Sequence, residues 1–179
     1  MNDSIKHKEH TFEKYITNSD ILKKINELAN EMNNDYKFKN PIFLGVLNGS
    51  IYFMMDLLKM IDFDYEIDFV KIKSYSGVTQ GKLSFKYIDF NKFKDRNVII
   101  VEDIIDSGRT IKLLYKKIFE FNPQSCQIIT LLKKESIKHF DNRKIDHFCF
   151  EIKNKYVIGY GLDINNLFRN LKDIYIKNG

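Results

Sequence analysis

Three carboxylates stand close together at the end of an apolar run, and they are the strongest sign of chemistry in this chain. Four apolar residues at 98–101 lead directly into Glu102 and Asp103, and Asp106 follows. Carboxylate oxygens accept hydrogen bonds from a sugar diol and coordinate hard cations such as Mg²⁺. In open α/β sheets, ligands bind outside the carboxyl ends of the strands. The pattern therefore predicts a buried strand that delivers Glu102 and Asp103 to a sugar or metal site, with Asp106 beyond them.

The turn after these carboxylates has the composition of a phosphate-binding loop. Its residues after Asp106 are Ser107, Gly108, Arg109 and Thr110. A helix is predicted directly after the turn, so backbone N–H groups and the positive end of the helix dipole would point at one anion. The plain alternative is that Asp106 or Ser107 only caps the helix. Capping alone does not explain three carboxylates behind a buried strand, so the pattern favours a monophosphate site.

Three segments carry apolar residues at the spacing of an amphipathic helix. These residues are Ile21, Ile25, Leu28, Ala29 and Met32 in the first, Ile51, Met54, Met55 and Leu58 in the second, and Ile111, Leu114, Tyr115, Ile118 and Phe119 in the third. Ser19 or Asp20 is available as the N-cap of the first helix, and Asn122 with Pro123 ends the third.

The predicted strands alternate with these helices. Apolar runs at 42–47, 65–74, 98–101, 126–132, 148–152 and 156–160 are predicted as strands, and 173–177 is expected to close the sheet. The polar segment from Tyr75 to about Lys86 carries two glycines and predicts a mobile loop. Alternation of this kind indicates an α/β fold with a mostly parallel sheet and crossover helices. No repeat or Pro/Gly-rich linker divides the sequence, so we expect a single domain over 1–179.

The composition is that of a globular protein of the cytoplasm. Apolar residues make up 44% and charged residues 30% of the 179 positions, which argues against disorder. No apolar run reaches the roughly 18 residues that span a bilayer, and the N-terminus is polar, so we expect neither a membrane span nor a signal peptide. Cys126 and Cys149 fall in predicted strands and are expected to be buried free thiols. The lysines behind the net charge of +5 are spread along the chain, which favours a solvated surface over a nucleic-acid or other polyanion contact.

Five blocks of the sequence, in the right order, resemble the purine phosphoribosyltransferases, and the hypoxanthine-guanine branch in particular. The run 98–110 resembles their phosphoribosyl-diphosphate motif, and 47–50 their pyrophosphate loop, where a non-proline cis peptide would fall between Leu47 and Asn48. Ser74 and Tyr75 match the start of their flexible catalytic loop. Lys133 and Lys134 match the lysine near the purine 6-oxo group, and 156–163 with 168–169 their C-terminal segment.

The resemblance implies a type I phosphoribosyltransferase fold, with flanking helices, a small hood formed by the terminal segments and a flexible active-site loop. It gives Glu102 and Asp103 to the ribose hydroxyls and the Mg²⁺ hydration shell. Asp106 would exchange a proton with purine N7. The 5′-phosphate would be cradled by Ser107, Gly108, Arg109 and Thr110. Asn48, Gly49 and Arg169 would bind pyrophosphate.

The resemblance also assigns the purine site. Lys134 would donate to O6 and select oxopurines over adenine. Lys133 stays an alternative, because the spacing from the lysine pair to Glu151 is one residue longer than the family pattern. Tyr156 would stack on the purine, and otherwise would be a plain core aromatic. The backbone of Val157 and Asp163 would meet the far edge of the base, and the Asp163 side chain would bind a second Mg²⁺.

The function implied is purine salvage by a pentosyltransferase, in which phosphoribosyl diphosphate and hypoxanthine or guanine give IMP or GMP and pyrophosphate. A relative that prefers xanthine or another base is the nearest alternative. A regulator that senses phosphoribosyl diphosphate while binding nucleic acid is disfavoured, because a sensor does not need the proton-transfer group Asp106. By the same resemblance we expect small-molecule substrates, a homodimer or homotetramer, and neither nucleic-acid nor membrane partners.

Overall fold

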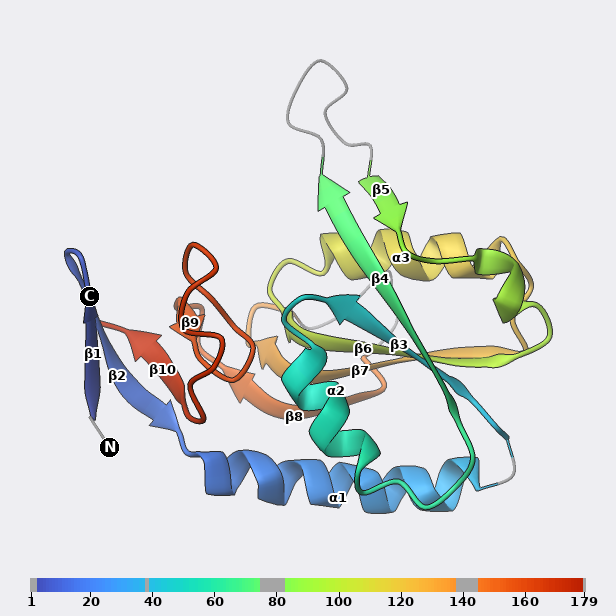
Figure 1. Cartoon of the computed structure of the whole chain (residues 1–179), viewed down its shortest axis with the longest axis horizontal. Coiled ribbons are helices and arrows are strands. Elements are labelled where there is room, and N and C mark those ends of the chain that lie inside the picture. The colour runs from blue at the N-terminus through green and yellow to red at the C-terminus, as the bar shows by residue number, and fades with distance from the viewer. Residues whose placement is uncertain (1–2, 38, 75–82, 138–144, 179) are drawn as a thin grey trace.

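The computed structural model describes residues 3–37, 39–74, 83–137 and 145–178, and its centre is a six-stranded sheet (Figure 1). Five strands are parallel: β3 (Ile42–Leu47), β4 (Glu66–Ser74), β6 (Asn97–Ile105), β7 (Ser125–Lys134) and β8 (His147–Ile152). The short strand β5 (Leu83–Lys86) pairs antiparallel with β4. Across the sheet the order is β5-β4-β3-β6-β7-β8. The predicted α/β fold with a mostly parallel sheet is confirmed.

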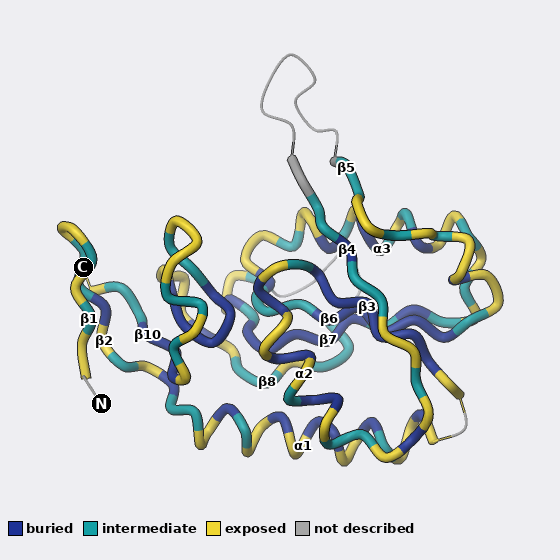
Figure 2. The backbone as a smooth tube through the Cα atoms, in the orientation of Figure 1, coloured by how far each residue is buried: buried dark blue, intermediate teal, exposed yellow. Residues whose placement is uncertain are grey.

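Helices cover both faces of this sheet. Helices α1 (Asn18–Tyr36) and α2 (Ile51–Leu58) pack on one face, and α3 (Arg109–Phe119) with the 3₁₀ helix η1 (Phe90–Phe93) on the other. Strand β6 is fully buried at its start (Figure 2). Because strand side chains alternate between faces, Ile99 and Val101 join the core under α1 and α2, while Val98 and Ile100 join the core under α3.

The two ends of the chain form a second, four-stranded sheet, in the order β1-β2-β10-β9. Its strands are β1 (Ser4–His7), β2 (His10–Ile16), β10 (Ile174–Lys177) and β9 (Val157–Ile158). This sheet is the expected hood, and it lies to one side of the main sheet in Figure 1. The prediction that 173–177 closes the main sheet was therefore wrong. The predicted strand at 156–160 is short because Gly159, Tyr160 and Gly161 all have positive φ.

Some local predictions need correction. The N-cap of α1 is Thr17, whose Oγ1 accepts a hydrogen bond from the Asp20 N–H, rather than Ser19 or Asp20. In α2 the buried side chains are Phe53, Met54, Leu57 and Leu58, so the expected burial holds for two of four residues. Ile51 and Met55 are exposed, because the short helix turns a different stripe toward the sheet. Cys126 is buried, whereas Cys149 is only partly buried.

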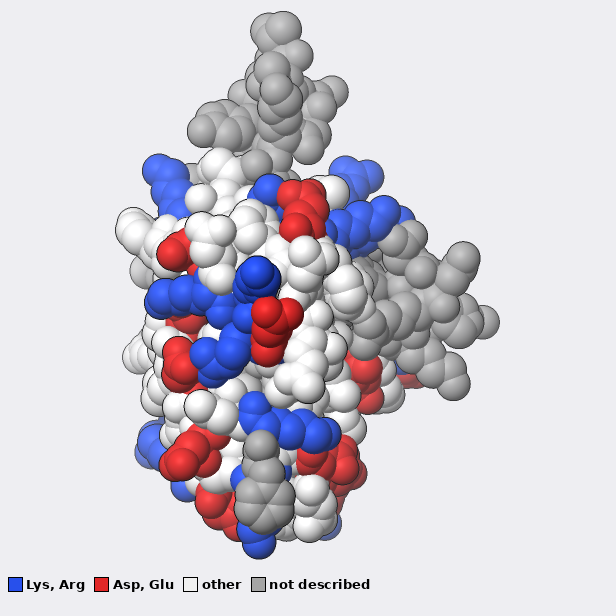
Figure 3. Space-filling view, turned by 90° about the vertical axis from the view of Figure 1, so that its right-hand side faces the viewer, with Lys and Arg blue, Asp and Glu red and all other residues white. Residues whose placement is uncertain are grey.

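On the face drawn in Figure 3, positive and negative side chains are mixed rather than segregated. Figure 3 shows one face, on which lysine and arginine side chains lie among aspartate and glutamate side chains. Several lysines of the protein are in ion pairs, such as Lys92 with Asp68 and Lys117 with Glu120. Within the described residues, no helix has the length and apolar character needed to cross a membrane.

Candidate active site

The candidate site lies where the direction of the chain through the sheet reverses. From β3 the chain moves outward to β4, and it then returns past β3 to β6 and continues to β7 and β8. In sheets of this order, ligands bind beyond the carboxyl ends of the two strands at the reversal. Here those strands are β3 and β6. The first ends at Leu47, followed by the expected cis peptide to Asn48, and the second carries the carboxylates.

Strand β6 continues through Ile105, so Glu102 and Asp103 lie inside it rather than in a turn. The two residues line different cavities. Glu102 lines a cavity beside α3, and Asp103 lines a second cavity toward the hood. Burial and the neighbouring Asp103 charge raise the pKa of Glu102 well above its ordinary value. Burial also raises the pKa of Asp103, against the lowering effect of its hydrogen bond with the Glu102 carboxyl group and, to a smaller extent, of the Arg169 charge. The pair is short of positive charge, which suits a cationic or diol ligand.

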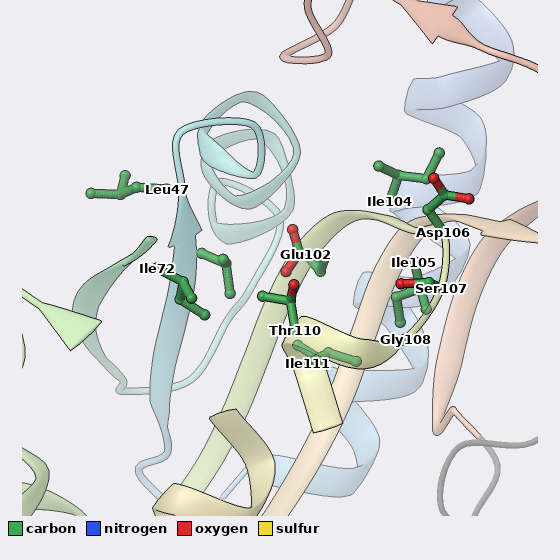
Figure 4. A pocket seen from close by; sticks show the side chains of 11 residues that line it. Leu47, Ile72, Glu102, Ile104, Ile105, Asp106, Ser107, Gly108, Thr110 and Ile111 are labelled. Atoms are coloured by element: carbon green, nitrogen blue, oxygen red, sulfur yellow. The ribbon is translucent and has the colours of Figure 1, made fainter. Parts of the chain in front are cut away.

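The first cavity, of about 220 Å³, has the features of a phosphate site (Figure 4). It is lined by Glu102, Asp106, Ser107, Gly108 and Thr110, together with apolar residues such as Leu47 and Ile72. Gly108 has φ of 68° and precedes the first turn of α3, so the N-terminal N–H groups of that helix face this hollow. The Arg109 side chain is exposed, and its neighbours line the cavity.

The second cavity, of about 180 Å³, adjoins the first through Ile104 and Asp106, which line both. Lys134 Nζ lies 2.9 Å from Asp106 Oδ1. Lys134 is 8% exposed, while Asp106 is exposed. A donor and an acceptor therefore stand side by side at the wall of this hollow.

Lys133 lies elsewhere, although both lysines belong to β7 rather than following it. Its ammonium group contacts the Glu151 carboxylate on β8 and lies 4.6 Å from the centre of the Phe148 ring. Adjacent residues of a strand point to opposite faces, so Lys134 can face Asp106 only if Lys133 faces away.

The C-terminal segment closes the second cavity. Tyr156, Val157 and Asp163 line it, and the Tyr156 hydroxyl donates to the Asp163 carbonyl at 2.7 Å. The Asp163 carboxylate is engaged on both oxygens: Oδ1 lies 2.6 Å from Arg169 Nη2, and Oδ2 accepts from the Asn166 N–H at 2.7 Å. Tyr156 is 49% exposed, so it is not a plain core aromatic.

Comparison with known proteins identifies the family of this chain. The model of the phosphoribosyl transferase domain matches residues 13–165. The chain belongs to the phosphoribosyltransferase family. It is 40% identical over 158 residues to the hypoxanthine-guanine-xanthine phosphoribosyltransferase of Tritrichomonas foetus, covering 88% of this chain and 86% of that protein.

Two solved phosphoribosyltransferases show the same architecture. The hypoxanthine phosphoribosyltransferase of Staphylococcus aureus superposes with a TM-score of 0.83 at 32% identity, covering 93% of this chain and 91% of that one. A point mutant of the hypoxanthine phosphoribosyltransferase of Trypanosoma cruzi, solved with the product IMP, gives a TM-score of 0.83 at 26% identity, covering 97% and 94%. The chain thus falls in the hypoxanthine-guanine branch of the family.

The carboxylates of this phosphoribosyltransferase fit a magnesium ion that is held partly by substrate. Mg²⁺ usually binds one or two carboxylates and completes its shell with water and substrate phosphates. Glu102 and Asp103 offer such a pair at the wall of the cavities. Within the part of the chain that the structure describes, no three acidic, histidine or cysteine side chains come close enough to cage a metal alone. Asp163 would have to exchange Arg169 or the Asn166 N–H for a second ion.

Some site residues were not predicted, and others cannot be placed. Lys155 lines the second cavity, but a lysine in a polar turn gives no signal in sequence. Ile104 and Leu162 also line it, and their apolar character indicated only core. Ser74 is the last residue of β4; its side chain, like the whole of Tyr75, lies outside the described residues.

The raised pKa of Glu102 predicts that this carboxylate costs stability at neutral pH. A folded-state pKa above the unfolded one means that the contribution of the group is fully present below the unfolded pKa, and is lost as pH rises through the folded pKa. In magnesium-free buffer at pH 8, Glu102→Gln should therefore unfold about 2–4 °C higher than the wild type, or about 1 kcal/mol for a chain of this size. Thermal unfolding from pH 5 to pH 8 measures this difference.

The exposed Glu13 on β2 is the matched control, because Glu13→Gln makes the same chemical change at a position that lines neither cavity. Its melting temperature should follow that of the wild type across the series. If the difference in melting temperature between Glu102→Gln and the wild type does not grow with pH, ionisation of Glu102 does not lower the stability of the folded protein.

Proposed function

We propose that the protein transfers the 5-phosphoribosyl group of phosphoribosyl diphosphate to hypoxanthine and guanine, giving IMP and GMP with release of pyrophosphate. The observation that carries this proposal is the pairing of Lys134 with Asp106 at 2.9 Å in the cavity that adjoins the phosphate site. A 6-oxopurine presents its O6 acceptor next to the N7 position, where a proton can be donated. Adenine presents an amino group in place of O6 and would meet the lysine donor with a donor.

The residues of the site suit displacement at C1 of the ribose. Nitrogen N9 of the purine forms the new bond, the bond from C1 to the pyrophosphate oxygen breaks, and the N7 proton passes to Asp106 as general base. Glu102 and Asp103 hold the ribose hydroxyls near a sugar that gains positive charge. The phosphate is cradled by Ser107, Gly108, Arg109 and Thr110, and the pyrophosphate is bound by Asn48, Gly49 and Arg169. A bound Mg²⁺ supplies charge neutralisation at the leaving group.

The purine is held from several sides. Lys134 donates to O6, Tyr156 stacks on the ring, and the backbone of Val157 and Asp163 meets its far edge. Asp163 would also hold a second Mg²⁺ through Oδ2, the oxygen that accepts the Asn166 N–H, while Oδ1 stays paired with Arg169. By the family resemblance, the segment that starts at Ser74 and Tyr75 would exclude water, which would otherwise hydrolyse the activated sugar.

Further parts of the proposal concern the whole molecule. The chain acts as one domain in the cytoplasm, as a homodimer or homotetramer with small-molecule substrates and neither nucleic-acid nor membrane partners. The exposed apolar residues Ile51, Tyr52 and Met55 on α2 support association between copies. Neither Cys126 nor Cys149 is in a disulfide, and burial raises the pKa of the Cys149 thiol to about 12, which is compatible with a reducing compartment.

The deciding assay supplies phosphoribosyl diphosphate and Mg²⁺ with hypoxanthine, guanine or xanthine. We expect IMP and pyrophosphate from hypoxanthine, and GMP from guanine. Initial rates with the three bases rank them and decide whether xanthine is also accepted, as the name of the Tritrichomonas relative implies for that protein. A folded sample that turns over none of them contradicts the proposal.

Replacing each of the two lysines separates their roles. Lys134→Met removes the donor to O6 and leaves Asp106 without its partner, so kcat/KM for hypoxanthine should fall about 10- to 150-fold, the range for a bond to a charged group. Discrimination against adenine should fall with it. Lys133→Met is the control, because its ammonium group faces Glu151, and it should stay within about twofold of wild type. A larger loss in Lys133→Met would transfer the O6 role to that residue.

A further inference from the structure

The turn Gly159-Tyr160-Gly161 has an unusual backbone that the functions assigned above do not use. All three residues have positive φ, of 96°, 49° and 96°. The Tyr160 N–H donates to the Leu171 carbonyl at 2.8 Å, and the Gly161 N–H donates to the Arg169 carbonyl at 2.9 Å. A non-glycine residue in this region of φ is unfavourable unless its surroundings hold it. The conformation of the turn therefore depends on the contacts that surround it.

One side of the turn presses on the pyrophosphate loop. A methyl group at Gly161 would stand 2.1 Å from the Gly49 carbonyl oxygen, and one at Gly49 would stand 1.7 Å from Asp103 Oδ2. The three residues are thus stacked with no room for a side chain between them. Because such contacts are nearly incompressible, a shift of Gly161 toward the loop must move Gly49, and Gly49 in turn rests on Asp103.

The Tyr160 side chain contacts α2, the helix that follows the pyrophosphate loop. Tyr160 is 2% exposed, and its hydroxyl donates to Asp56 Oδ2 on α2 at 2.7 Å. Its ring lies 6.1 Å from the ring of Tyr52, one turn earlier on α2. The turn therefore contacts both the pyrophosphate loop and one face of the helix that begins directly after it.

The other end of the turn leads to the purine side. Arg169 Nη1 donates to the Gly161 carbonyl at 2.7 Å, and Arg169 Nη2 pairs with Asp163. Asp163 in turn accepts the Tyr156 hydroxyl on its carbonyl. A purine that stacks on Tyr156 would thus contact a segment that is connected to the turn by these hydrogen bonds and this ion pair.

We propose that the Gly159–Gly161 turn couples the purine site to the pyrophosphate loop, with Tyr160 and Gly161 as positioning residues. Binding of the purine fixes the turn, and the turn holds Gly49 and α2 in the position that receives the diphosphate. By linkage, each substrate then tightens the binding of the other by the same factor. This inference rests on the proposed function, because it requires that the two cavities take a purine and phosphoribosyl diphosphate.

The test measures that factor without turnover. A hypoxanthine with carbon in place of N9 cannot form the nucleoside bond, so it and phosphoribosyl diphosphate with Mg²⁺ can be bound together to the full-length protein. The factor is the Kd of phosphoribosyl diphosphate alone divided by its Kd with saturating analogue, both from calorimetry. Couplings between sites are commonly about 5- to 150-fold, and we expect a wild-type factor in that range.

Tyr160→Phe removes the hydroxyl bond to Asp56 and keeps the ring, and it should lower the factor at least about threefold. Tyr65→Phe is the matched control: its hydroxyl donates to the Leu58 carbonyl, at the other end of α2, and its loss should leave the factor unchanged. Asp56→Ala deletes the same bond from the helix side. It should give the same reduction as Tyr160→Phe, and the double variant should add nothing. The Asp56→Ala variant also tests the inference if Tyr160→Phe folds poorly.

A wild-type factor near one would overturn the inference, as would a factor in both Tyr160→Phe and Asp56→Ala equal to that of Tyr65→Phe. Failure of the inference is distinguishable from failure of the proposed function. If the wild type forms IMP but the variants keep the wild-type coupling factor, only the coupling is refuted. If the wild type forms no nucleotide, both the coupling and the proposed function are refuted.

Discussion

Asp106→Asn should lower turnover of hypoxanthine about 10²- to 10⁴-fold, the usual contribution of a positioned general acid or base. The amide keeps the shape of the side chain and can still accept a hydrogen bond from Lys134, but it cannot take the N7 proton. Asp106 is also exposed at the junction of the two cavities, so the change should have little effect on folding. Affinity for IMP should stay within a few-fold of wild type, because the phosphate and ribose contacts are unchanged.

The measurement combines steady-state IMP formation with a calorimetric Kd for IMP. Asp62→Asn, at a position after α2 and away from both cavities, is the control for the chemical change and should turn over normally. An Asp106→Asn variant with wild-type turnover would remove Asp106 from the proton transfer. Loss of IMP binding together with turnover would instead assign it to nucleotide binding.

The sequence was informative about this site because strand periodicity and helix-terminus chemistry are local. Four apolar residues before Glu102 predicted a buried strand, and the hydroxyl- and glycine-rich turn predicted the helix N-terminus that now lines a cavity with Ser107 and Thr110. Alternation along the strand implied that adjacent carboxylates point to different sides. Glu102 and Asp103 do line different cavities, but their carboxyl groups still meet in a hydrogen bond.

Other features depended on contacts between distant segments. The hood sheet pairs β2 near the N-terminus with β10 near the C-terminus, and the short strand β1 alternates between exposed and half-buried residues, with no apolar run to signal it. Strand β6 extends to Ile105 because β7 pairs with it that far, whereas the three carboxylates in the sequence suggested an earlier turn. The separation of Lys133 from Lys134 likewise required the register of β7 against β8, which sets Lys133 beside Glu151.

The reason for a glycine at a given position can also depend on contacts with distant segments, which the sequence does not show. In the sequence, Gly49 belongs to the segment that resembles a pyrophosphate loop, and this resemblance alone does not say why the position needs a glycine. The structure gives the reason, since the space for its side chain is already filled by the Asp103 carboxylate, 1.7 Å from where a methyl group would stand. That contact joins residues that lie far apart in the sequence.

Gly49→Ala should therefore damage catalysis more than stability. The added methyl group must displace either the Asp103 carboxylate or the pyrophosphate loop, and a misplacement of about 1 Å in a positioned group can cost about 10²-fold in rate. We expect kcat/KM for phosphoribosyl diphosphate to fall by about that factor, while affinity for the purine analogue measured alone changes far less. Steady-state kinetics with each substrate varied, together with thermal unfolding, measures both effects.

Gly45→Ala separates the site from general overpacking. A methyl group at Gly45 would stand 2.6 Å from the Met54 sulfur and 2.9 Å from the Phe69 ring, which are core side chains on α2 and β4 rather than site residues. Overpacking of a core costs about 1–3 kcal/mol, so this variant should melt earlier yet keep kcat/KM near wild type in its folded fraction. The same loss of kcat/KM in both variants would mean that Gly49 acts through stability alone. A loss confined to Gly49→Ala locates the effect at the contact between the pyrophosphate loop and Asp103, where the leaving group and the metal-binding carboxylate have to be held in register.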